Sequence, residues 1–233
     1  MVIDYILDFV FPPRCIICGS LTGYGLNIKI CNKCSENAEY VENDWDYTYT
    51  LNNKLRHKVY YDGGKAVFKY KFVKKSIERF KYFGARSLGK EYAKIMYEYF
   101  ADSGLFEKAD CIVSVPINKH RFKTRGYDQA GYLAEKLAEA SNIEFVPNGI
   151  IRHKNTMPQN KLGVNERFKN VKDAFSVGNF DFKYKNVIIV DDIFTTGATI
   201  NECAKVLKIS GANKVYFMTF AAAGESLGSD ENV

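Results

Sequence analysis

Short apolar runs rich in β-branched residues alternate along the chain with longer stretches in which apolar residues recur at helical spacing. The runs predict strands at residues 59–61, 66–68, 111–115, 175–177, 187–190 and 215–220, and the stretches predict helices at residues 73–83, 87–100, 129–140 and 198–210. Asp62, Gly63 and Gly64 separate the first two runs and are typical of a hairpin turn. The alternation predicts an α/β fold with a mostly parallel sheet and helices on its faces.

The segment from Val187 to Thr199 carries the clearest chemical signal. Its first four residues predict a strand buried on both faces, and Asp191 and Asp192 follow at the carboxyl edge, where open α/β sheets bind ligands. The next residues offer hydroxyl groups and free backbone N–H groups at the start of a helix: Thr195, Thr196, Gly197, Ala198 and Thr199. A phosphate fits such a helix start.

Acidic residues before a phosphate cradle favour a ligand with hydroxyl groups at one end and phosphate at the other, such as a ribose phosphate. Adjacent carboxylates also favour a divalent cation nearby, bound directly or through water. The segment is neither a Walker A loop nor a dinucleotide fingerprint, because it lacks the Gly-Lys-Ser/Thr and the three spaced glycines that these need. The simpler alternative is that Asp191 and Asp192 only end a strand and cap the next segment.

Four cysteines form two Cys-x-x-Cys pairs separated by twelve residues: Cys15, Cys18, Cys31 and Cys34. This spacing is typical of a tetrahedral zinc site in a small zinc ribbon. Two disulfides are the competing interpretation, and the first ten residues favour metal, since they carry Asp4 and Asp8 and no basic start of a secretion signal. A closed four-cysteine site leaves no position open for catalysis, so we expect a structural role, with a redox role as the alternative.

A length of 233 residues allows one α/β domain with a small appended module. We expect a zinc-binding module with a short N-terminal helix at residues 1–45, a bridging hairpin and helices at 46–110, the core at 111–223 and a disordered tail at 224–233. Apolar spacing in the first ten residues predicts a docked amphipathic helix and no transmembrane segment. Cys111 and Cys203 are expected to be ordinary core residues.

Two polar segments are interpreted as loops near the site, and the first follows the strand predicted at residues 111–115. Residues 114–129 are predicted as a basic loop, in which Arg121, Lys123 and Arg125 suit pyrophosphate or nucleic-acid phosphate; a solvated surface loop is the alternative. Residues 152–167 are predicted as a long loop, and loops of that length are functional lids or disordered segments.

The thirteen residues from Val187 resemble the phosphoribosyl pyrophosphate (PRPP) motif of the type I phosphoribosyltransferases, and nearly the whole chain resembles the ComF (ComFC) family of competence proteins. That family has two Cys-x-x-Cys pairs, a Lys-Tyr-x-Gly element that matches residues 81–84, and a Val-Pro…Arg…Arg-Gly-Phe-Asn-Gln element that matches residues 115–129. Its Arg-x-Arg-x-Thr-x-x-Gln…Arg-x-x-Asn…Ala-Phe element matches Arg152, Lys154, Thr156, Gln159, Arg167, Asn170, Ala174 and Phe175. The departures are Asn118 and Lys119 for His-Pro, Asp128 for Asn and Lys154 for Arg.

The resemblance implies a type I phosphoribosyltransferase-like sheet flanked by helices, with a small N-terminal zinc ribbon. It implies that Asp191 and Asp192 hold the ribose of Mg²⁺-bound PRPP and that residues 195–199 bind its 5-phosphate. Family membership also implies a role in natural transformation, in which imported single-stranded DNA is handled with a helicase partner. The expected location is cytoplasmic, including the inner face of the cell membrane.

Two functions of different classes remain open from the sequence. A phosphoribosyltransferase of nucleotide metabolism or salvage would pass the phosphoribosyl group to an unknown acceptor base, a displacement that needs positioning and charge more than a covalent nucleophile. A binding protein would use the same cradle for a DNA-end phosphate or a nucleotide without turnover.

Composition is compatible with single-stranded DNA as a partner. The net charge is +6, the pI is about 8.8 and aromatic residues make up 15% of the chain, which suits a basic groove with stacking platforms. Lysines and aromatic residues are densest at residues 60–75. The alternative is that AT-rich coding enriches Lys, Asn, Ile, Phe and Tyr, since a charge run is usually a solvated face.

Overall fold

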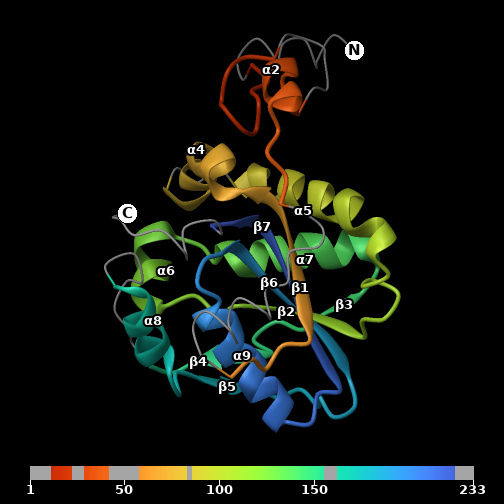
Figure 1. Cartoon of the computed structure of the whole chain (residues 1–233), viewed down its shortest axis with the longest axis vertical. Helices are drawn as coiled ribbons and strands as arrows, with labels where there is room; N and C mark the ends of the chain where they lie inside the picture. The colour runs from red at the N-terminus through yellow and green to blue at the C-terminus, as the bar shows by residue number, and fades with distance from the viewer. Residues whose placement is uncertain (1–11, 23–28, 42–57, 83–85, 155–161, 224–233) are drawn as a thin grey trace.

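The computed structural model describes residues 12–22, 29–41, 58–82, 86–154 and 162–223. The predicted N-terminal helix, the expected boundary between residues 45 and 46 and the predicted tail from residue 224 lie outside these ranges. In the described part, a central sheet lies between helices on both of its faces, and the cysteine-containing segment lies beyond α4 at one end (Figure 1).

Five strands form the central sheet in the order β1-β7-β6-β2-β3, and every neighbouring pair is parallel. Their bounds are Gly63–Lys69 (β1), Cys111–Ser114 (β2), Glu144–Phe145 (β3), Asn186–Phe194 (β6) and Lys214–Ala222 (β7). β6 and β7 are the longest of the five and mostly buried, because each has a strand on both sides and helices cover the faces. The predicted α/β class with a mostly parallel sheet is confirmed.

A second sheet of two antiparallel strands lies outside the central one. β4 (Ile150–Arg152) pairs with β5 (Phe175–Val177), and β5 packs against α9. The sequence predicted the strand at 175–177 but not its partner, because β4 is three residues long and follows a turn without an alternating pattern. This small sheet holds Arg152 beside the carboxyl edge of the central sheet.

The hairpin predicted around Asp62 is wrong, because Gly63 and Gly64 begin β1 and pair in parallel with Tyr216 and Phe217 of β7. Glycine serves close approach here: a Cβ on Gly64 would lie 2.1 Å from the ring of Phe217. The Asp62 carboxylate accepts a hydrogen bond from Val215 N at 2.8 Å and lies 2.6 Å from the ammonium of Lys208, which anchors the start of the strand.

The main helices are α4 (Tyr70–Tyr82), α5 (Arg86–Phe100), α7 (Gln129–Ser141) and α9 (Ala198–Ile209), and they confirm the four predicted helices with shifts of a few residues. Shorter elements are α2 (Asn32–Glu36), the 3-10 turn η2 (Ala101–Ser103), α6 (Lys119–Arg125) and α8 (Val164–Val171). α6 and α8 correct the prediction of two irregular loops. Both are short and mainly polar, so their sequences lack the apolar periodicity of a packed helix.

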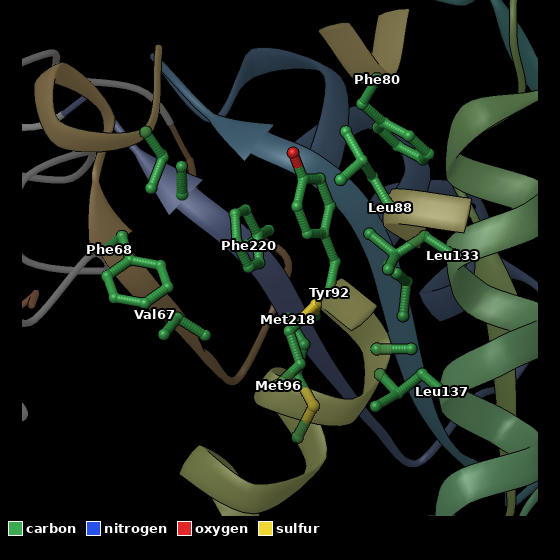
Figure 2. Close-up of a cluster of buried hydrophobic side chains, with 14 of the residues drawn as sticks. Val67, Phe68, Phe80, Leu88, Tyr92, Met96, Leu133, Leu137, Met218 and Phe220 are labelled. Atoms are coloured by element: carbon green, nitrogen blue, oxygen red, sulfur yellow. The ribbon is translucent and has the colours of Figure 1, made fainter. Parts of the chain in front are cut away.

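Two apolar layers enclose the sheet. On one face α4, α5 and α7 pack on β7 and β6. The rings of Tyr92 and Phe220 stack there with centroids 3.7 Å apart, and Figure 2 shows both side chains within this cluster. On the other face α9 packs against β6, β7 and the small sheet. Cys111 and Cys203 are fully buried in this second layer, as expected for core residues.

Candidate functional site

The strand order of the central sheet reverses between β2 and β6. β2 leads on to β3 at one side, whereas β6 leads on to β7 at the other. β2 pairs with β6 only as far as Ser114, opposite Val190, while β6 continues beside β7 to Phe194. The pairing of β2 with β6 therefore ends before the carboxyl end of β6, and open α/β sheets bind ligands at such a switch point.

Asp191 and Asp192 lie in this extension of β6. The sequence placed them after the strand, but β7 keeps pairing with β6 past them, with Asp191 opposite Thr219. Asp191 Oδ1 accepts a hydrogen bond from Asp192 N at 2.8 Å, and Oδ2 of Asp192 lies 2.8 Å from Nζ of Lys81. The two acids thus stay at the carboxyl edge, although the strand is longer than predicted.

The positive charge beside Asp191 and Asp192 only partly compensates their two carboxylates. Burial and, next, the neighbouring Asp192 carboxylate raise the pKa of Asp191 well above its usual range, and Lys81 opposes them only in part. Two adjacent, largely buried carboxylates, with one ammonium paired to Asp192, favour a further cation or several hydrogen-bond donors. Ligand hydroxyl groups, with or without a divalent cation, supply these.

The cradle predicted at residues 195–199 forms the turn between β6 and α9. Gly197 has φ of 74° and ψ of −3°, a left-handed conformation that suits glycine, and it directly precedes the helix. Thr196 is buried, and its Oγ1 accepts a hydrogen bond from Ala198 N at 3.4 Å. The first N–H groups of α9 therefore lie just beyond the two acids, with Thr195 and Thr199 on either side of the turn.

Two arginines approach the same edge from different elements. Arg121 lies on α6 and Arg152 ends β4. Burial lowers the pKa of Arg152 and the charge of Arg121 lowers it further, whereas Cys203 and Asp191 oppose them, so Arg152 interacts both with Arg121 and with Asp191. The guanidinium of Arg152 also lies 5.4 Å from the ring centre of Phe175. The edge thus combines two acids with two guanidinium groups.

Arg125 is fixed beside the start of α7. Its Nη1 donates a hydrogen bond to Gln129 Oε1 at 2.9 Å, and its guanidinium lies 5.2 Å from the ring centre of Tyr82. Gln129 is buried and donates to the backbone oxygen of Tyr127. These contacts hold Arg125 in one place, in contrast to the irregular basic loop that the sequence suggested.

The remaining predicted basic residues are less closely gathered. Lys123 is exposed on α6, and Lys154 is exposed with Nζ 3.4 Å from Lys172 O. Arg167 lies on α8, where its Nε donates to Leu162 O at 3.0 Å. Thr156 and Gln159 lie outside the described residues. The structure therefore brings Arg152 to Asp191 and Arg121 to Arg152. Lys154 and Arg167 precede and follow residues 155–161 in the chain.

Lys81 is the site residue that sequence reasoning missed. It comes from the last turn of α4, far from β6 in the sequence, and its side chain is only 19% exposed. The Lys-Tyr-x-Gly match at residues 81–84 was the available signal, but a motif alone does not tell which acid its lysine meets. The contact with Asp192 supplies that role.

The four predicted metal ligands lie together. The sulfur atoms of Cys15, Cys18, Cys31 and Cys34 all lie within 4.8 Å of one another. Against the effect of its burial, hydrogen bonds from Ser20 lower the pKa of Cys18 to about 6, whereas burial and the other thiols raise the pKa of Cys34. Four clustered thiols cannot all ionise without a cation, so the cluster fits a tetrahedral zinc ion. None of the six cysteines forms a disulfide.

A cavity of about 370 Å³ lies on the other side of the β2 carboxyl end. Its lining includes Arg86, Tyr127, Tyr132, Glu135 and Phe145, and it does not include the two acids or the turn before α9. This cavity is therefore distinct from the edge that holds Asp191.

The aromatic and lysine-rich segment at residues 60–75 does not form the continuous surface patch that its composition suggested. Tyr61 and Phe68 are 3% and 1% exposed and belong to the two apolar layers. The exposed members are lysines of α4, such as Lys74 and Lys75. Separately, no helix within the described ranges combines the length and apolar character that a bilayer span needs.

Comparison with known proteins agrees with this geometry. A family model described as phosphoribosyl transferase domain matches residues 85–233. The chain is 29% identical over 231 residues to Competence protein F of Haemophilus influenzae, covering 91% of this chain and 98% of that protein. It is 35% identical over 106 residues to DNA utilization protein YhgH of Salmonella typhi, 46% of either chain.

Solved structures align with the chain at lower similarity. Glutamine PRPP amidotransferase of B. subtilis aligns with a TM-score of 0.42 and 21% identity, over 60% of this chain and 30% of that one. Purine phosphoribosyltransferase of Pyrococcus horikoshii aligns with a TM-score of 0.35 and 18% identity, over 60% and 94% of the two chains. The family model and the similarity to Competence protein F confirm the resemblance derived from the sequence motifs.

Proposed function

The chain belongs to the phosphoribosyl transferase domain family, and on this premise we propose that it binds PRPP at the carboxyl edge of β6. The observation that carries the proposal is that Asp191, Asp192, the N-terminal turn of α9 and Arg152 lie at one switch point, with Arg121 close to Arg152. A ligand with ribose hydroxyl groups between two phosphate groups matches this arrangement of acids and donors.

Each group has a distinct task in this proposal. Asp191 and Asp192 accept hydrogen bonds from the ribose hydroxyl groups, and residues 195–199 receive the 5-phosphate on backbone N–H groups and threonine hydroxyls. Arg121 and Arg125 would bind the pyrophosphate. Mg²⁺ bound with PRPP would add positive charge beside the two carboxylates, where burial already makes negative charge costly.

The proposed biological role is DNA uptake in natural transformation, with single-stranded DNA on the cytoplasmic side and a competence helicase as partner. The similarity to Competence protein F, which extends over 98% of that protein, supports this role. The net charge of +6 and the exposed lysines of α4 are compatible with a DNA phosphate backbone. In this role the protein uses PRPP or a related phosphoribosyl group as a bound ligand, and association with the inner face of the membrane would be peripheral.

An active phosphoribosyltransferase of nucleotide metabolism or salvage is the second candidate. A stretch of 117 residues is 35% identical to the amidophosphoribosyltransferase of Lachancea kluyveri, covering 50% of this chain and 21% of that protein. In such a reaction the anomeric carbon of the ribose loses pyrophosphate and gains a bond to an acceptor nitrogen. Positioned charges such as Arg121 and Arg125 would stabilise the departing pyrophosphate.

Calorimetric titration with PRPP, with and without Mg²⁺, tests the proposed site. We expect Mg²⁺-dependent binding by the wild-type protein and a loss of at least about tenfold in affinity when Asp191→Asn and Asp192→Asn are combined, since charge-assisted hydrogen bonds are lost. The matched control combines Asp102→Asn with Glu107→Gln, which removes two exposed charges away from the edge. Undiminished binding by the first variant would show that the site is assigned wrongly.

A second titration separates the two candidate functions. Fluorescence anisotropy with a labelled single-stranded oligonucleotide measures DNA binding in the same variants. DNA binding that survives the loss of both acids, while PRPP binding fails, places the two ligands on separate surfaces. Pyrophosphate release in the presence of a panel of acceptor bases identifies turnover, and its absence favours the binding role.

A further inference from the structure

The last turn of α4 places three consecutive residues in contact with three different parts of the molecule. Arg79 reaches the cysteine-containing segment, Phe80 accepts a hydrogen bond from the hydroxyl of Tyr127 through its backbone oxygen, and Lys81 reaches Asp192 of β6. This turn lies before the part of the chain that the family model matches, which begins at residue 85. The last turn of α4 therefore contacts both the four-cysteine segment and the carboxyl edge of β6.

Arg79 grips the turn between the first two cysteine ligands. Its Nη2 donates to the backbone oxygens of Cys15 and Ile17, each at 3.3 Å, and also to that of Ile16. Gly19 leaves room for the guanidinium, because a Cβ at that position would lie 2.9 Å from Arg79 Nη1. The conformation of the turn from Cys15 to Cys18 therefore determines where Arg79 is held.

A second contact from α4 supports the same turn. Ser76, one helical turn before Arg79, donates a hydrogen bond to Ile16 O, and its hydroxyl lies 2.5 Å from that of Tyr92. Both side chains are fully buried. The turn that supplies two of the cysteine ligands thus also accepts hydrogen bonds from α4 through its carbonyl groups. These hydrogen bonds fix the orientation of the helix, in the same way that hydrogen bonds to metal ligands fix the orientation of those ligands.

Lys81 transmits this orientation to the phosphoribosyl edge. Its ammonium lies 2.8 Å from Asp192 Oδ2, and the side chains are only 19% and 10% exposed, so water screens the pair weakly. The pair keeps the Asp192 carboxylate turned towards Lys81. A shift in the last turn of α4 would release the carboxylate that receives the ribose.

We propose that the last turn of α4 couples the four-cysteine metal site to the phosphoribosyl site, through Arg79 on one side and Lys81 on the other. Zinc holds the Cys15–Cys18 turn, that turn holds Arg79, and Lys81 is thereby kept on Asp192. The metal-loaded protein consequently binds the phosphoribosyl ligand more tightly than the metal-free protein. This inference rests on the proposed function, because it specifies how that site is regulated.

The first test uses Mg²⁺-PRPP calorimetry on Arg79→Met, Lys81→Met and the double variant. Lys75→Met, which removes an exposed charge from the same helix, is the control and should bind as the wild type does. We expect Arg79→Met to retain zinc, as measured with a metal indicator, and to lose about tenfold in PRPP affinity. The double variant should bind PRPP at most about twofold more weakly than Lys81→Met does, because both changes break the same path.

Either of two results overturns the coupling: unchanged PRPP affinity in Arg79→Met, or losses that multiply in the double variant. If the wild-type protein itself binds no PRPP, the proposed function fails and the coupling with it. Wild-type binding that Arg79→Met leaves unchanged defeats the coupling alone.

Linkage provides a second measurement that does not depend on the folding of any variant of α4. Coupling is reciprocal, so saturating Mg²⁺-PRPP must tighten zinc by the same factor by which zinc tightens PRPP. Zinc transfer to a chelator is measured on the wild-type protein with and without PRPP. We expect PRPP to lower the equilibrium constant for this transfer about tenfold. The Asp191→Asn, Asp192→Asn protein corrects for zinc binding by free PRPP. Equal transfer in both conditions would refute the proposal.

Discussion

Gly64→Ala tests whether the start of β1 is packed as closely as the structure describes. The added methyl group would lie 2.1 Å from two carbon atoms of the Phe217 ring and 2.4 Å from a third, so the ring must move. Phe217 is fully buried, and its ring stacks on Phe194 at 4.8 Å and meets Tyr61 edge-on at 5.0 Å. The ring has little space into which to move.

The size of the effect follows from two opposing terms. Overpacking a dense core costs about 1–3 kcal/mol, whereas replacing glycine by alanine at an unstrained position gains about 0.4–1 kcal/mol from the unfolded chain. We therefore expect Gly64→Ala to lower the free energy of unfolding by about 1–2 kcal/mol. Gly63→Ala is the matched control, because its Cβ would lie 3.7 Å from Tyr216, an ordinary contact. It should be neutral or slightly stabilising.

Urea unfolding followed by far-UV circular dichroism measures both variants, and the urea dependence should keep its slope. Combining Gly64→Ala with Phe217→Leu should recover part of the loss by removing the ring edge. Because Phe194 immediately precedes the turn before α9, PRPP affinity should also fall severalfold in Gly64→Ala alone. Equal stability of the Gly63 and Gly64 variants would refute the close-packing argument and favour a flexible turn at these glycines.

Three further outcomes concern the site itself. Gly197→Ala should lower the free energy of unfolding by about 1–2 kcal/mol, because the φ of 74° at this position is left-handed. It should also weaken PRPP binding measured by calorimetry, and unchanged binding would argue against the phosphate cradle at residues 195–199. Asp191→Asn should raise the thermal midpoint at pH 7. Burial raises the folded-state pKa of Asp191 above the usual 3.8, so its ionisation destabilises the fold as pH rises above that value, and the gain should vanish when calorimetric scans reach pH below about 4. Protein prepared without chelator should contain about one zinc per chain by metal analysis, and chelation should lower its thermal midpoint; a content far below one would contradict the site.

Local sequence was sufficient where one short segment determines both structure and chemistry. β6, the turn at Gly197 and α9 are contiguous, so the apolar run, the two acids and the helix start could be recognised together. The same holds for the cysteine pairs, whose spacing alone brings four sulfur atoms together. In both cases the groups that cooperate are close in the chain.

Long-range contacts account for the features that the sequence did not reveal. Gly63 and Gly64 have the composition of a turn, and only the parallel partner near residue 217 makes them a strand. The Lys-Tyr-x-Gly match marks Lys81 among the lysines of α4 but does not name its partner, and its pairing with Asp192 depends on how the helix packs on the sheet. Phe68 was counted with a basic surface because its neighbours are lysines, although β7 and α4 bury it.

Residues 58–82 are part of the phosphoribosyl fold, not merely a connection to it. The family model begins at residue 85, yet β1 pairs along β7 from Gly63 to Lys69 and covers what would otherwise be an open sheet edge. α4 then continues directly from β1 and delivers Lys81 to Asp192. The segment that completes the sheet thus also completes the proposed ribose-binding edge, and its Arg79 contacts the metal-binding turn. A chain built in this way cannot alter its cysteine module without disturbing the helix that orients one of its two acids.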